Sequence, residues 1–114
     1  MLPAAHRMHR SSEFTSVVRG GDRFGTRTLV VHHRSGLEPG RAPAVGLVVS
    51  KAVGGSVVRH RVSRRLRAVL AARTSRLAMG SGTVVRALPA AATASSRALA
   101  ADVDRALARH AARA

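Results

Sequence analysis

Residues 54–70 read GGSVVRHRVSRRLRAVL and place five arginines in a window about one helix long. These are Arg59, Arg61, Arg64, Arg65 and Arg67. Like charges repel one another at this spacing, and the window contains no acidic residue that could pair with them. Such a cluster indicates a partner that carries the opposite charge.

The apolar residues of this window predict one helix with two different sides. At about 100° per residue, one side collects Val58, Val62, Leu66, Val69 and Leu70. The opposite side carries His60, Arg64 and Arg67, and Arg61 and Arg65 flank them. We expect a helix from Ser56, as its N-cap, to about Ala72. Its apolar side docks on a sheet and its positive stripe of up to five groups faces a partner.

The charge of the whole chain supports the same interpretation. The 114 residues contain 20 Lys and Arg against 5 Asp and Glu, a net charge of +15, and no acid lies between Glu38 and Asp102. A helix face that is merely solvated usually mixes both signs. Nucleic acid is the first candidate partner because bound arginines release the counterions of phosphates. A membrane surface comes second and an acidic protein third.

The rest of the chain predicts a single small α+β domain. A helix is expected over 12–19 with Ser11 as its N-cap, strands over 27–33, 44–50 and 83–88, and a last helix capped by Ser95 or Ser96. A further short strand over 22–26 has a weaker signal. The first two of the three main strands are expected to pair antiparallel through their loop. Residues 1–10 read as a flexible basic segment before a domain at 11–111.

Composition narrows the function further. The chain has no cysteine and no apolar run of the roughly 20 residues that a membrane span needs, so we expect a cytoplasmic protein without a membrane. Neither a helix-turn-helix nor a zinc-finger pattern is present, which disfavours DNA. Only two aromatics besides histidine are available to stack bases. RNA recognised through its backbone and shape fits best. No catalytic or metal-ligating residue is expected in the chain itself.

Several segments resemble the bacterial ribonuclease P protein subunit. GGSVVRHRVSRRLR resembles the family's basic signature, VGLVVSK its strand ending in Ser-Lys, SSEFTSVVRGG its first helix, and TVVRALP its last strand. The likeness runs from about Met8 to Leu107. Within the signature, His60 and Ser63 replace the usual Asn and Lys, and Gly55 stands where Asn is common.

The resemblance implies the function. The chain would bind the catalytic ribonuclease P RNA and the 5′ leader of precursor tRNA, as a monomer in the holoenzyme, and assist the removal of the leader. Mg²⁺ would be held mainly by the RNA. The expected RNA-binding residues are Lys51, Gly55, Arg59, His60, Arg61, Arg64, Arg65 and Arg67. The expected leader cleft consists of Phe14, Val18 and His32, with help from arginines such as Arg10 and Arg27.

The resemblance also implies a left-handed crossover from strand through the basic helix to strand, which is rare among proteins. Two other functions remain open from the residues alone. One is a ribosomal or other structural RNA-binding protein with no nuclease partner. The other is a protein-only nuclease, which the five scattered acids disfavour.

Overall fold

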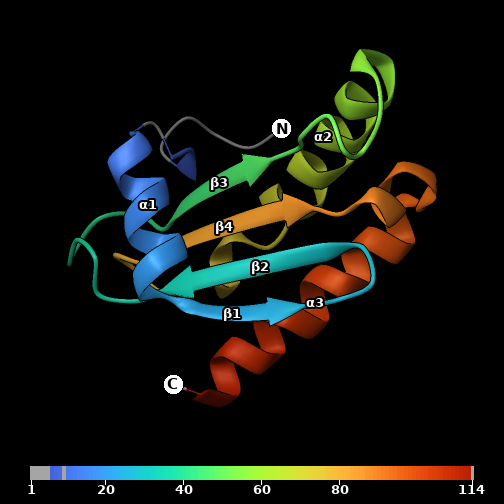
Figure 1. The fold of residues 1–114 in the computed structure, drawn as a ribbon. Helices are drawn as coiled ribbons and strands as arrows, with labels where there is room; N and C mark the ends of the chain where they lie inside the picture. The colour runs from blue at the N-terminus through green and yellow to red at the C-terminus, as the bar shows by residue number, and fades with distance from the viewer. Residues whose placement is uncertain (1–5, 9, 114) are drawn as a thin grey trace.

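The computed structural model describes residues 6–8 and 10–113, which form three helices, four strands and two short 3-10 helices (Figure 1). The order is α1 (Ser11–Gly20), β1 (Asp22–Gly25), β2 (Leu29–Arg34), β3 (Ala44–Val48), α2 (Ser56–Ala71), η2 (Thr74–Arg76), β4 (Gly82–Ala87), η3 (Pro89–Thr93) and α3 (Ser96–Arg113). The predicted α+β class is confirmed, and the weakly indicated strand exists as β1. None of the described helices is both long and apolar enough to cross a membrane.

The four strands form one sheet in the order β1-β2-β4-β3. β2 pairs antiparallel with both β1 and β4, whereas β3 and β4 run parallel. The sheet is therefore mostly antiparallel, but the predicted antiparallel pairing of the strands now labelled β2 and β3 is wrong. β4 lies between β2 and β3 and forms backbone hydrogen bonds with both. The crossover through α2 brings the chain back to the end of the sheet where β3 starts, so β4 runs parallel to β3.

The β3-α2-β4 unit is the left-handed crossover that the resemblance implies. β3 and β4 point the same way in Figure 1, with β4 below β3, and α2 passes behind the sheet. A right-handed unit with this strand order would place the helix in front. The crossover puts α2 on the sheet face opposite α1.

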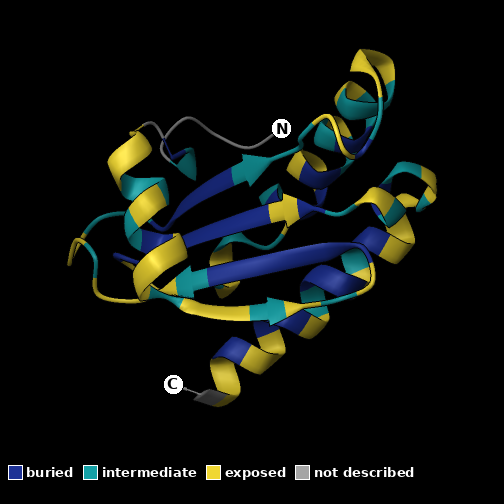
Figure 2. Ribbon diagram, viewed as in Figure 1, coloured by how far each residue is buried: buried dark blue, intermediate teal, exposed yellow. Residues whose placement is uncertain are grey.

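Buried residues run along β2 and β4 (Figure 2), and the alternation of side chains along the strands divides the core into two clusters. Val31, Val45 and Val85 belong to the larger cluster, together with Leu66 of α2 and other residues of α2 and α3. The smaller cluster lies under α1 and contains Val17, which is fully buried, with Met8, Ala44 and Val84. The basic helix is thus held by its apolar side, as its pattern predicts.

The helix caps differ in part from the sequence prediction. Ser11 and Ser56 are each the first residue of their helix rather than its N-cap, and the N-cap positions are Arg10 and Gly55, neither with a side-chain hydrogen bond. Ser95 does cap α3, since its hydroxyl accepts a hydrogen bond from the backbone N–H of Ala98.

Part of the N-terminal segment lies along the edge of β3. The backbone N–H of Met8 donates to the carbonyl of Val45 at 2.9 Å, and Arg7 forms a parallel bridge with the same residue. Met8 is 8% exposed. Residues 1–5 and 9 lie outside the described residues, and the flexibility expected over 1–10 stays a prediction.

Candidate nucleic-acid interface

The chain enters α2 through a turn that needs glycine. Gly54 has φ +156°, in the region that side chains rarely adopt, and a Cβ there would lie 3.0 Å from Val58. Gly55 follows as the N-cap, and a Cβ on it would meet open space. No side chain caps the N-terminus of α2, and the space around it is open. The first backbone N–H groups of the helix are therefore accessible, which favours binding of an anion there.

His60, Arg64 and Arg67 are exposed and follow one another at i, i+4 and i+7. This spacing places them on one side of α2, away from the buried Val62 and Leu66. The three residues form what we call the α2 stripe. They include His60, which stands where the resembled family has Asn.

Arg61 and Arg65 have a different environment from the α2 stripe. Both are half-buried: Arg61 Nη2 donates to the carbonyl of Ala92 at 3.2 Å, and Arg65 Nη1 donates to that of Ala94 at 2.8 Å. Arg59 is also half-buried, and its Nε has no hydrogen-bond partner among the described residues. The expected row of five exposed cations thus divides into an exposed part and a part fastened to the segment before α3.

Four of the five acids of the chain pair with arginines outside α2. Glu13 and Glu38 both pair with Arg41, Asp104 pairs with Arg73 and Arg76, and Asp102 lies 3.5 Å from Arg105. All these arginines lie outside α2. None of these four acids pairs with a residue of the α2 stripe, so Arg64 and Arg67 remain available to a partner.

Lys51 lies in the turn that leads to α2 and is exposed. β3 ends at Val48, so this lysine does not stand at the end of the strand, as expected, but three residues beyond it. Its place near the uncapped end of α2 adds a cation to that end of the helix.

The expected leader cleft lies on the other face of the sheet. The ring of Phe14 packs on Gly46, where a Cβ would be 2.5 Å from Cε1 of the ring. Val18 is 44% exposed on α1, and the neighbouring Val17 is fully buried. α1 thus presents one aromatic ring and one valine beside the open part of this face.

His32 completes this set but is only 8% exposed. It lies opposite Arg23 in the β1-β2 register. Burial lowers the pKa of His32, and the nearby charges of Arg23 and Arg86 lower it further. Its Nδ1 is buried without a hydrogen-bond partner among the described residues. The imidazole is therefore neutral near pH 7.

Arg23 and Arg86 are the two residues on this face that sequence reasoning missed. Alternation within their strands predicts only that each shares a face with its i±2 neighbours. Bringing both beside His32 requires the strand order, because β4 pairs with β2 across a gap of some fifty residues in the chain.

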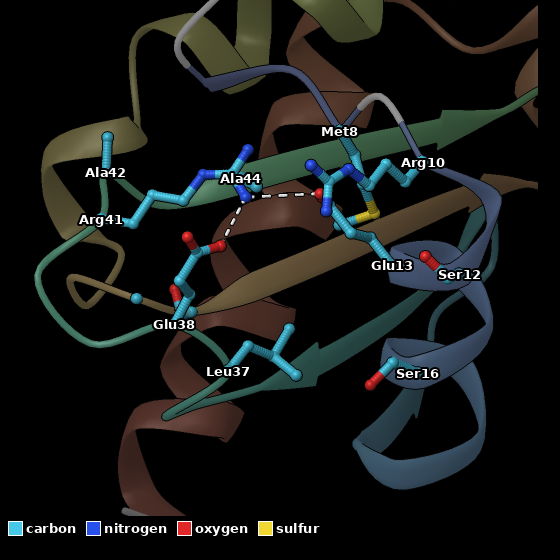
Figure 3. Close-up of a pocket in the computed structure, with 12 residues that line it drawn as sticks. Met8, Arg10, Ser12, Glu13, Ser16, Leu37, Glu38, Arg41, Ala42 and Ala44 are labelled. Atoms are coloured by element: carbon cyan, nitrogen blue, oxygen red, sulfur yellow. Dashed lines mark hydrogen bonds and ion pairs between the residues drawn. The ribbon is translucent and has the colours of Figure 1, made fainter.

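A pocket of about 230 Å³ lies beside the start of α1 (Figure 3). The guanidinium of Arg41 bridges the carboxylates of Glu13 at 3.3 Å and Glu38 at 2.7 Å across it. These contacts fasten the loop before β3 to α1. Three of the four charged residues that line the pocket thus pair with one another, Arg10 being the fourth, and we interpret the pocket as structural.

A second pocket, of about 530 Å³, lies where β2 and the C-terminal half of α3 meet. His33 and His110 line it, with their ring centroids 5.2 Å apart, and His33 Nδ1 lies 2.9 Å from the hydroxyl of Thr83. Within residues 6–8 and 10–113, no three or more His, Asp or Glu side chains are grouped so that they could hold a metal ion.

Comparison with known proteins agrees with this geometry. The family model for ribonuclease P matches residues 2–111. The chain is 56% identical over 104 residues to the ribonuclease P protein component of Beutenbergia cavernae, covering 91% of this chain and 87% of that protein. It is 48% identical over 112 residues to that of Corynebacterium diphtheriae, covering 94% of each.

Among solved structures, a Staphylococcus aureus RNase P protein mutant described as having defective mRNA degradation activity superposes with a TM-score of 0.75. The alignment covers 89% of this chain and 84% of that one at 20% identity, so it supports the fold alone.

Proposed function

The chain belongs to the ribonuclease P protein family, whose members are accessory subunits of an enzyme that cleaves tRNA precursors, and from this premise we propose how it acts. Its α2 stripe binds the catalytic RNA subunit. The face beside α1 binds the 5′ leader of precursor tRNA. The protein thereby assists the RNA-catalysed removal of the leader, as a monomer in a cytoplasmic holoenzyme that does not act on DNA.

The observation that carries this proposal is the exposed α2 stripe, formed by His60, Arg64 and Arg67. Cations that share one direction on a rigid helix can meet several phosphates of a folded RNA together. Lys51, Gly55 and Arg59 extend this contact at the start of α2. Arg61 and Arg65 are proposed to contribute from its flank, with fewer free N–H groups.

We propose that Mg²⁺ is held mainly by the RNA subunit and that the protein binds none tightly. Glu13, Glu38 and Asp104 are engaged with arginines, and Asp102 accepts hydrogen bonds from Thr28. A cation would have to displace these partners. The chain's contribution is to bring RNA phosphates and the leader together.

Reconstitution tests the proposal. Purified protein with a bacterial ribonuclease P RNA should cleave precursor tRNA at low Mg²⁺, where the RNA alone is slow. No gain over the RNA alone would reject the proposal and favour the alternative of a structural RNA-binding protein. A reaction with protein and an mRNA but no RNA subunit tests the third function. Cleavage there would show a nuclease activity of the chain itself.

A further inference from the structure

α1 leaves part of its sheet face open. It crosses one end of the strands in Figure 1, and the rest of that face carries no helix. The register there forms two rows across the sheet. The first row is Arg23, His32, Val84 and Gly46, and the second is Gly25, Val30, Arg86 and Val48. No acidic residue belongs to either row.

Arg23 and Arg86 are the only arginine or lysine residues in these rows. Both are exposed, and neither forms a hydrogen bond or ion pair with another described residue. Arg34 lies further along the same face of β2 but is already engaged, because its Nη1 donates to the hydroxyl of Ser16 at 2.6 Å. The open face therefore offers two guanidiniums that have no hydrogen-bond or ion-pair partner within the part of the chain that the structure describes.

The same face is poor in aromatic rings. Phe24 belongs to the opposite face, where Arg109 lies over its ring at 5.6 Å. Phe14 is packed on Gly46, and His32 is almost fully buried. Sequence-tolerant stacking on a protein usually needs successive exposed rings. This face can offer little stacking, so charge must supply most of its attraction for a single strand.

We propose that Arg23 and Arg86 each hold a phosphate of the single-stranded leader, so that this face binds the leader's backbone and discriminates little among its bases. The proposal rests on the proposed function, which supplies the leader as ligand. β1 and β4 are separated by one strand, or roughly 10 Å between their axes. The two arginines are thus far enough apart to contact separate phosphates of an extended strand.

The test compares three single-charge variants in the reconstituted holoenzyme. Arg23→Gln and Arg86→Gln remove the proposed contacts. Arg97→Gln removes another exposed arginine, from α3 on the other side of the sheet. Dissociation constants are measured for precursor tRNA with leaders of equal length composed of A, C or U, and for mature tRNA without a leader.

We expect Arg23→Gln and Arg86→Gln each to weaken binding of the leader-bearing precursor by about fivefold or more, since each variant loses a charge-assisted contact. The salt dependence, plotted as log K against log salt, should flatten by about 0.7 for each lost phosphate. Both variants should bind mature tRNA as tightly as the unmodified protein does. Arg97→Gln should bind both precursor and mature tRNA like the unmodified protein. The three leaders should bind the unmodified holoenzyme within about threefold of each other, because little stacking discriminates them.

Two results would overturn the inference while leaving the proposed function intact. In the first, the unmodified holoenzyme cleaves normally, but Arg23→Gln and Arg86→Gln both bind leader-bearing precursor as tightly as Arg97→Gln does. The other is a spread of more than about tenfold among the leaders, which would indicate base readout. A failure of the unmodified protein to assist cleavage at all is a different outcome and would reject the proposed function first. Thermal denaturation of each variant confirms that it is folded.

Discussion

At the scale of single residues, Gly46 determines how closely α1 approaches the sheet. The ring of Phe14 occupies the space where any other residue would place its Cβ, at 2.5 Å from Cε1. A gap this short does not occur between real atoms, so a side chain at position 46 must displace the ring. Phe14 thus depends on a glycine of β3, some thirty residues away in the chain, for its position in the proposed leader site.

Gly46→Ala should therefore destabilise the protein and weaken leader binding together. Displacing the Phe14 ring overpacks the small core under α1, at a cost of about 1–3 kcal/mol in the free energy of unfolding. Thermal denaturation and affinity for leader-bearing precursor measure the two effects. Gly25→Ala is the matched control, because a Cβ at Gly25 has no atom within 4 Å and its φ is not positive. Equal midpoints for the two variants would contradict this account.

At the scale of elements, α2 shows which features a sequence can predict. Its extent and its apolar side follow from a local repeat, and the structure confirms both to within a residue at the C-terminal end. The environment of its arginines does not follow. The carbonyls that hold Arg61 and Arg65 belong to residues 92 and 94, about thirty positions later, and they reach α2 only because the crossover brings η3 beside it.

This division of α2 can be tested with two double variants of equal charge. Arg64→Ala with Arg67→Ala should weaken binding of the RNA subunit and flatten its salt dependence by up to about two units, without lowering the thermal midpoint. Arg61→Ala with Arg65→Ala should lower the midpoint, since each loses a hydrogen bond worth about 1 kcal/mol. Filter binding and thermal denaturation measure the two properties. If the two double variants changed RNA binding and the thermal midpoint by the same amounts, the difference in environment between the two pairs of arginines would have no energetic consequence.

The docking of α3 on β2 should depend on pH through His33. Burial lowers its pKa, and the nearby His110 lowers it further, while Asp22 of β1 acts in the opposite direction. The folded protein therefore binds a proton at His33 less readily than the unfolded chain, whose pKa is near 6.5. Stability is then highest above about pH 6.5 and falls as the pH drops below it, as the unfolded state takes up the proton first.

Thermal midpoints at pH 7.5 and 5.5 test this expectation. The unmodified protein should have the lower midpoint at pH 5.5. In His110→Phe the fall in midpoint between pH 7.5 and 5.5 should be smaller. The variant keeps an aromatic ring at this position but removes the imidazole whose charge lowers the pKa of His33. If His110→Phe keeps the full drop in midpoint, the His33–His110 pair does not govern the pH dependence.

At the scale of the whole molecule, the sheet separates the two proposed RNA-binding surfaces. The body measures 37 × 27 × 25 Å, with α2 behind the sheet and the proposed leader face in front (Figure 1). One small domain can therefore contact the RNA subunit and the leader together. This arrangement follows from the central position of β4, which was not predictable from residue patterns. The left-handed crossover was expected from the family resemblance alone, against the usual preference of such units.

The net charge of +15 predicts that salt affects the free protein and its RNA complex in opposite directions. In the free protein, the arginines of α2 repel one another without acids to offset them, and salt screens this repulsion over about 10 Å at 0.1 M. Raising NaCl from about 0.05 to 0.5 M should therefore raise the thermal midpoint followed by circular dichroism, while it weakens RNA binding through lost counterion release. Arg64→Ala with Arg67→Ala should gain less stability from salt, because two of the repelling charges are gone. A midpoint that falls with salt would mean instead that the ion pairs of Arg41 and Asp104 outweigh the repulsion.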